Sequence, residues 1–268
     1  MKKYLGYILA VLGLVLLLPF SANAEEFSEV LTKKELQTLT NKVGLTEDEI
    51  KNYPTEVLRQ LIKENAKKVA SGSTIETFYE PSAESSPGTI TTMGTIPSTD
   101  IKLAGTAYKV TSDISGRDKF YFYGSFQWLK SPTWELTDKM TIGFPSGYGF
   151  YLPTSGGSVT QHQHRYSWDS DKNGSYTDYS IKYTPVSWSA NAGVAGAYDL
   201  IAGEGLHKGY IGQYVYVPTT NNGSMNIKIE YGHKVVSGSV SVGVYPAGLG
   251  ITPSTNTDTR SYALTINY

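Results

Sequence analysis

The sequence of 268 residues has 40% hydrophobic residues, 18% charged residues, a net charge of −1, 27 Gly, 21 Tyr and no Cys. Nucleic-acid-binding proteins carry an excess of Lys and Arg that neutralises phosphates, and disordered chains lack apolar residues, so the composition argues against both classes. Because Cys is absent, disulfide scaffolds and cysteine-ligated metal sites are excluded.

Residues 1–24 have the pattern of a removable export signal. Two lysines follow the initial Met, residues 8–20 form an apolar run, and residues 22–24 read Ala-Asn-Ala, which is a signal-peptidase motif. The apolar run is shorter than the roughly 20 residues that a membrane-spanning helix needs. The sequence therefore predicts cleavage after Ala24 and a secreted, extracellular protein.

Residues 25–72 are predicted to form a helical segment of about three short helices. This stretch holds 17 of the charged residues and only two of the glycines. Thr32 with Glu35, and Thr46 with Glu49, have the spacing of a capping box, in which the Thr side chain accepts from the N3 amide and the Glu side chain reaches back. The two boxes predict where the first two helices begin.

The third helix is expected to have Pro54 in its first turn and to end at Gly72. Gly44 would end the first helix in a left-handed conformation. The third helix has an apolar stripe at helical spacing, which fits either a small cap on the protein or a module for a partner. The stripe consists of Val57, Leu58, Leu61, Ile62, Ala66 and Val69.

Residues 73–100 are rich in Ser, Thr, Pro and Gly and are predicted to be a linker. Residues 101–268 alternate apolar and polar side chains in runs of β-branched and aromatic residues, separated by turn signals such as Asn173-Gly174. The clearest runs are residues 119–123, 140–144, 210–217, 225–231, 239–244 and 262–268. The expected fold is mainly β: an antiparallel β-sandwich, jelly-roll-like, preceded by a small helical region.

His162 and His164 are candidates for a zinc site. Residues two apart on a strand point to the same face, so both imidazoles could bind one ion, with His207 or His233 as a third ligand. With an open water position, such a site would support a metal-assisted hydrolase. The competing interpretation is a pair of ordinary strand histidines.

Asp169, Asp171 and Asn173 have the spacing that opens a calcium-binding loop, with Gly174 at the sharp turn. The bidentate Glu expected at the twelfth position is replaced by Ser180, which removes the strongest ligand. A hairpin turn at Asn173-Gly174 explains the same residues and is favoured. Neither Ca²⁺ nor Zn²⁺ is firmly implied by the sequence.

The aromatic residues are candidates for a carbohydrate-binding surface. Aromatic faces stack on sugar rings, and all four Trp fall in the β-region, although core packing explains aromatic residues equally well. These candidates are Trp128, Trp134, Trp168 and Trp188.

A membrane-active β-protein is a further alternative. The alternation of residues 262–268 resembles the last strand of a membrane barrel, and the Ser/Gly/Val alternation of residues 237–244 would suit an inserting hairpin. An ordinary terminal strand explains the first pattern as well.

Two further sets of residues form a pattern. In the helical segment they are residues 45–50 with Pro54, Val57, Leu58, Leu61 and Ile62; in the β-region they are Trp128, Pro132, Trp134, residues 136–139 and residues 231–233. This pattern resembles a group of uncharacterised exported proteins of Gram-positive, Bacillus-type bacteria. The resemblance implies secretion and a β-rich domain, and it supplies no catalytic residue.

Taken together, these features predict a secreted, non-enzymatic binding or structural protein that acts at a cell envelope, a matrix or a glycan surface. The expected partner is a cell-wall or matrix glycan. The alternatives are a secreted hydrolase and a β-protein that inserts into membranes.

Overall fold

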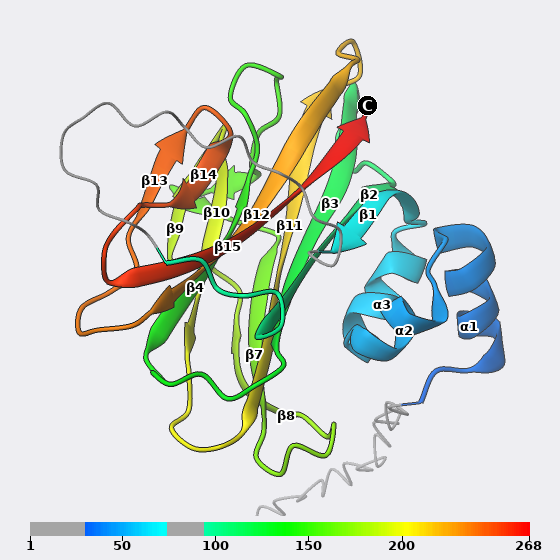
Figure 1. The fold of residues 1–268 in the computed structure, drawn as a ribbon. Coiled ribbons are helices and arrows are strands. Elements are labelled where there is room, and N and C mark those ends of the chain that lie inside the picture. The colour runs from blue at the N-terminus through cyan, green and yellow to red at the C-terminus, as the bar shows by residue number, and fades with distance from the viewer. Residues whose placement is uncertain (1–29, 74–93) are drawn as a thin grey trace, which may run out of the picture.

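The computed structural model describes residues 30–73 and 94–268. The predicted signal peptide and most of the predicted linker lie outside these residues. Two antiparallel sheets stack face to face, and a small group of helices lies on one side of the sandwich (Figure 1). The expected antiparallel β-sandwich with a helical region before it is confirmed.

The helices begin where the capping boxes predict. Thr32 and Thr46 each accept from the N3 amide, while Glu35 and Glu49 each accept from the cap amide. Gly44 has a left-handed φ of 88° and separates the first two helical stretches. The helical elements are α1 (Lys33–Thr38), which continues into the π-helical turn η1 (Leu39–Val43), then α2 (Glu47–Asn52) and α3 (Thr55–Lys63).

The third helix is shorter than predicted, and its expected second half is a strand. α3 ends at Lys63, and Asn65 takes a left-handed φ of 50°, which breaks the helix. Residues 67–73 then form strand β1 (Lys67–Ser73), which pairs with β2. The run of Ser and Gly at its end has low helix propensity, and pairing with β2 decides the conformation. The β-fold therefore begins before residue 101.

The six-stranded sheet carries the helices. Its strand order is β1-β2-β3-β11-β7-β8, so two strands far apart in sequence, β3 and β11, form its centre. Its remaining strands are β2 (Ile101–Val110), β3 (Arg117–Trp128), β11 (Leu206–Pro218), β7 (His162–Asp169) and β8 (Thr177–Lys182).

The five-stranded sheet covers the other side of the core in the order β15-β12-β4-β10-β9. Its strands are β15 (Thr257–Asn267), β12 (Ser224–Lys234), β4 (Thr137–Gly143), β10 (Gly193–Asp199) and β9 (Ser187–Ser189). Two small hairpins complete the fold: β13 (Val242–Tyr245) with β14 (Gly248–Ile251), and β5 (Thr154–Ser155) with β6 (Ser158–Val159).

The two patterns that raised a membrane strand have local explanations in this fold. In β15, Tyr262, Leu264 and Ile266 point into the core between the sheets. Of residues 237–244, only the last three are in a strand, and β14, the partner of that strand, packs against β4. No helix within residues 30–73 and 94–268 is long and apolar enough to cross a membrane.

The protein has two apolar cores because the central strands are covered on both faces. Successive residues of a strand point to opposite faces, so Phe120 and Phe122 of β3 fill the core between the sheets. Tyr121 and Tyr123 point the other way and pack under the helices with Leu58 and other apolar side chains of α3. The excess of Tyr therefore serves largely to build the layer between helices and sheet.

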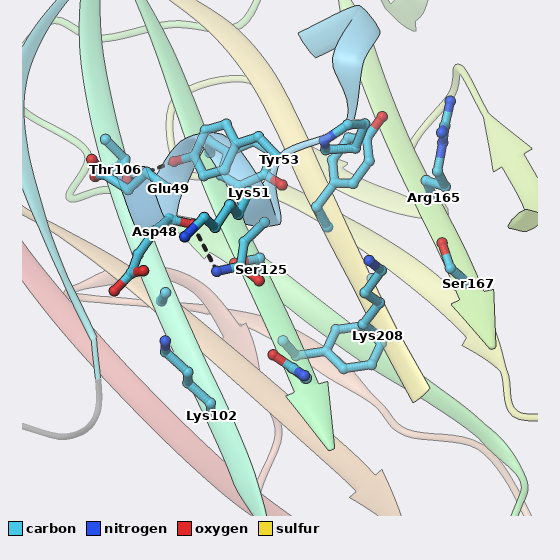
Figure 2. Close-up of a pocket in the computed structure, with 18 of the residues that line it drawn as sticks. Asp48, Glu49, Lys51, Tyr53, Lys102, Thr106, Ser125, Arg165, Ser167 and Lys208 are labelled. Atoms are coloured by element: carbon cyan, nitrogen blue, oxygen red, sulfur yellow. Dashed lines mark hydrogen bonds between the residues drawn. The ribbon is translucent and has the colours of Figure 1, made fainter. Parts of the chain in front are cut away.

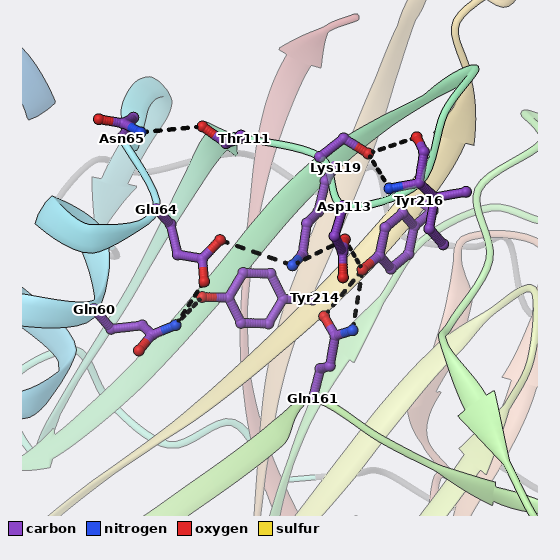
Figure 3. A network of polar contacts seen from close by, with 11 residues as sticks. Gln60, Glu64, Asn65, Thr111, Asp113, Lys119, Gln161, Tyr214 and Tyr216 are labelled. Atoms are coloured by element: carbon purple, nitrogen blue, oxygen red, sulfur yellow. Dashed lines mark hydrogen bonds and ion pairs between the residues drawn. The ribbon is translucent and has the colours of Figure 1, made fainter.

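A nearly buried polar network also ties α3 to the sheet (Figure 3). The ammonium of Lys119 on β3 lies 3.8 Å from a carboxylate oxygen of Glu64 and 3.2 Å from one of Asp113. The same ammonium lies 4.4 Å from the centre of the Tyr214 ring, and the Tyr214 hydroxyl accepts from Gln60. The helical layer is thus fixed by charge as well as by apolar contact.

Candidate ligand-binding groove

His162 and His164 do share one face of β7, as predicted, but that face is the inside of the sandwich. Both side chains are buried, and His164 packs against Gly196 and Tyr198 of the opposite sheet. Burial lowers the pKa of His162 to about 3 and that of His164 to about 4, so both imidazoles are neutral at physiological pH.

The hydrogen bonds of this pair fix its roles. The Gln213 amide donates to the carbonyls of Thr160 and Tyr214, so its oxygen accepts from His162 Nδ1 at 3.0 Å. His162 Nε2 then accepts from His164 Nδ1 at 2.9 Å. Three ring nitrogens of the pair are therefore used by these two bonds, and the lone pair that a metal would take on His162 is occupied.

The other two histidines do not join the pair. His207 is hydrogen-bonded to the hydroxyl of Tyr166 at 2.7 Å, and His233 to the carboxylate of Asp138 at 2.8 Å. Within residues 30–73 and 94–268, no group of three or more His, Cys, Asp or Glu is arranged to hold a metal ion. The predicted zinc ligands are thus not brought together by the fold.

The Asp169 loop has the hydrogen bonds of a turn. The carboxylate of Asp169 accepts from the backbone amides of Asn173 at 3.3 Å and Gly174 at 2.7 Å, and the Asn173 side chain accepts from the amide of Ser175. Asp171 is exposed and accepts from the adjacent serine. These oxygens bond to the chain itself rather than converging on one point.

The four tryptophans do not form a common platform. Trp128 is buried and donates to the Tyr231 hydroxyl, and Trp168 is half-buried against the core. Trp134 and Trp188 are exposed, at 50% and 39%, but lie at opposite ends of the five-stranded sheet. Trp188 pairs with Val194 at the start of β10, whereas Trp134 precedes the end of β4 that pairs with the last residue of β10.

A groove of about 620 Å³ lies between the α2–α3 corner and the outer face of the six-stranded sheet. Its floor comes from four neighbouring strands. Lys102 of β2 pairs with Gln127 of β3, Gln127 with Lys208 of β11, and Lys208 with Ser167 of β7. The next row on the same four strands consists of Ala104, Ser125, Tyr210 and Arg165.

The wall of the groove comes from the helical layer. Asp48 and Lys51 of α2 and the following Tyr53 stand above the floor, opposite the lysines of the sheet (Figure 2). Because the floor belongs to a continuous hydrogen-bonded sheet and the wall is fixed to it by the second core, the groove is built on rigid elements.

Tyrosine rings line the inner side of the groove. The ring of Tyr123 stacks between those of Tyr53, at 4.3 Å, and Tyr210, at 5.2 Å between centroids. Tyr176 lies at the open side, where its hydroxyl accepts from the Gln127 amide at 3.2 Å. Aromatic faces and side-chain donors therefore meet in one cleft.

Arg165 is the charged centre of the groove floor. It forms ion pairs with Glu56 of α3 and with Asp178 of β8, the latter at 2.5 Å. Its Nε is buried and has no hydrogen-bond partner among the described residues. Arg165 thus links the helical layer to the sheet edge and keeps one donor unused.

Lys208 is a half-buried cation on the same floor. Its ammonium lies 4.0 Å from the centre of the Tyr176 ring, and burial lowers its pKa from the usual range. Among the described residues, no carboxylate comes within ion-pair distance of Lys51, Lys102 or Lys208.

These groove residues were not predicted as a site from the sequence. They are Tyr, Lys, Gln and Ser from five separate segments, and only the strand register brings them together. The one available signal was the run of residues 119–123, where alternate aromatic residues on both faces indicated a strand that is covered on both sides.

A second surface feature lies on the edge strands. Between residues 179 and 188, which span the end of β8 and the start of β9, five large apolar or aromatic side chains are exposed by 38–67%. They are Tyr179, Ile181, Tyr183, Val186 and Trp188. Lys182 is the one charged residue within this segment.

No family model and no curated protein matches the chain. Solved structures with similarity include the Clostridium perfringens delta-toxin, at 8% identity and a TM-score of 0.36, over 75% of this chain and 90% of that chain. The membrane-inserted form of the Clostridium perfringens NetB toxin matches at 9% identity and 0.34, over 76% and 97%. A chain described as a pore forming protein matches at 9% and 0.37, over 75% and 92%.

Proposed function

We propose that the protein is an extracellular, non-enzymatic binding protein whose groove holds a saccharide-type ligand of a cell envelope or matrix. The observation that carries this proposal is the groove itself, in which tyrosine faces, amide and hydroxyl groups and ammonium groups meet on a rigid floor of four strands.

The size and chemistry of the groove fit such a ligand. Its volume of about 620 Å³ falls within the range of small-molecule sites. Sugar rings present flat CH faces together with many hydroxyls. Tyr176 supplies an aromatic surface at the opening, while Gln127 and Ser125 supply hydrogen bonds on the floor.

The test is binding to a panel of immobilised polysaccharides that includes peptidoglycan, followed by calorimetry on the ligand that is retained. We expect Tyr176→Ala to weaken binding about tenfold, because it removes one aromatic contact. Tyr148→Ala is the matched control, since Tyr148 is an exposed tyrosine outside the groove lining. The proposal is wrong if the protein retains no polysaccharide, or if both variants lose binding equally.

A second candidate function, attachment to a lipid membrane, is favoured by the exposed segment 179–188. Monomeric soluble proteins rarely expose a continuous apolar patch, and Tyr and Trp prefer the interface between lipid and water. The single charge, on Lys182, would complement anionic headgroups.

Vesicle flotation tests this candidate. The unmodified protein should float with vesicles that contain anionic lipid, and Tyr179→Ser with Tyr183→Ser should reduce the bound fraction at least fivefold. Dye release from the same vesicles separates attachment from pore formation. Equal flotation of the two proteins, or none with any vesicle, would remove the candidate.

A further inference from the structure

We propose that the ligand of the groove is an acidic saccharide, whose anionic substituent binds between Lys102 and Lys208. This inference rests on the proposed function and specifies the chemical class of the ligand.

The strand register places the two lysines on one row of the floor. Both pair with Gln127, from its two sides, so their backbones are separated by two strand spacings, about 10 Å. Figure 2 shows both side chains projecting from the sheet toward the α2 wall. Two extended lysine side chains at this separation can reach one anion that lies above Gln127.

The charges of the groove leave these lysines uncompensated. Arg165 already pairs with Glu56 and Asp178, and Glu49 already pairs with Lys68 at 2.8 Å. The remaining charged groups of the lining are three lysines, Lys51, Lys102 and Lys208, and one carboxylate, Asp48. The groove is therefore locally positive, although the whole chain has a net charge of −1.

Lys208 gives a second, independent reason. A partly desolvated ammonium is costly when no anion compensates it. Here its nearest described partner is the face of Tyr176, and the buried Nε of Arg165 is a further donor without a partner in the described part of the chain. A carboxylate, sulfate or phosphate on the ligand would satisfy these donors, whereas a neutral sugar would leave them as they are.

The test compares acidic polymers with their neutral counterparts at low salt. The matched pairs are polygalacturonate and its carboxyl-reduced form, dextran sulfate and dextran, and phosphomannan and mannan. We expect at least tenfold tighter binding of the acidic member in one pair, which also identifies the substituent. Lys208→Gln and Lys102→Gln should each abolish this preference without lowering affinity for the neutral member.

Lys42→Gln is the control, because Lys42 is an exposed lysine of the helical layer outside the groove lining. Equal losses in Lys42→Gln and Lys208→Gln would show general attraction to polyanions and would overturn the inference. Equal affinity for acidic and neutral members would overturn it too, while leaving the proposed function intact. If no polymer binds, both proposals are wrong.

Discussion

At the scale of single residues, the two histidines of β7 make folding stability depend on pH. His162 and His164 are buried, and burial lowers their pKa values to about 3 and about 4. In the unfolded chain a histidine has a pKa near 6.5, so as the pH falls the unfolded chain binds the proton first. The stability that the neutral pair confers is complete above about pH 6.5 and is lost as the pH falls toward these lower values.

We therefore expect the free energy of unfolding to fall between pH 6.5 and 4, by up to about 1.4 kcal/mol per pH unit for each histidine. His162→Gln keeps a hydrogen-bonding side chain but does not titrate, so its stability should fall less steeply in this window. Urea unfolding at several pH values measures both slopes. Because all carboxylates are common to both proteins, identical slopes would contradict the prediction.

The same residues show what spacing alone can and cannot predict. The H-x-H pattern correctly places both imidazoles on one face of a strand, because side chains alternate. Which face that is depends on the strands packed against β7, and these come from residues 193–199 and 206–218. The aromatic candidates failed for the same reason, since Trp128 faces the core and Trp134 does not.

At the scale of elements, the local signals that act within a few residues were read correctly. Both capping boxes form, and Gly44 takes the left-handed conformation, because each depends only on neighbours in the chain. β1 was missed because its pairing with β2 joins segments that are more than 30 residues apart. The groove was missed for the same physical reason, since its floor exists only in the register of four strands.

At the scale of the whole molecule, the helical layer and the sandwich form one unit, because the second core and the Lys119 network join them. Apolar side chains of α3 cover tyrosines of β2, β3 and β11, which would otherwise face water. The wall of the groove depends on this attachment. A change in the network should therefore affect the stability of the entire fold, rather than that of the helices alone.

The network is also unequal in its two signs of charge. The Lys119 side chain is only 6% exposed, whereas those of Glu64 and Asp113 are 22% and 56% exposed. If Lys119 is replaced, water can solvate both carboxylates. If the carboxylates are neutralised, the ammonium stays buried with only the Tyr214 and Tyr216 rings beside it.

We therefore expect the double variant Glu64→Gln with Asp113→Asn to lose about 3 kcal/mol of unfolding free energy, and Lys119→Met to lose about 1 kcal/mol. The amides preserve the shapes and the acceptors for Gln60 and Tyr216, so the difference reports on charge. Urea unfolding at pH 7 measures both values. A larger loss in Lys119→Met would mean that the carboxylates, rather than the lysine, depend on the network for their solvation.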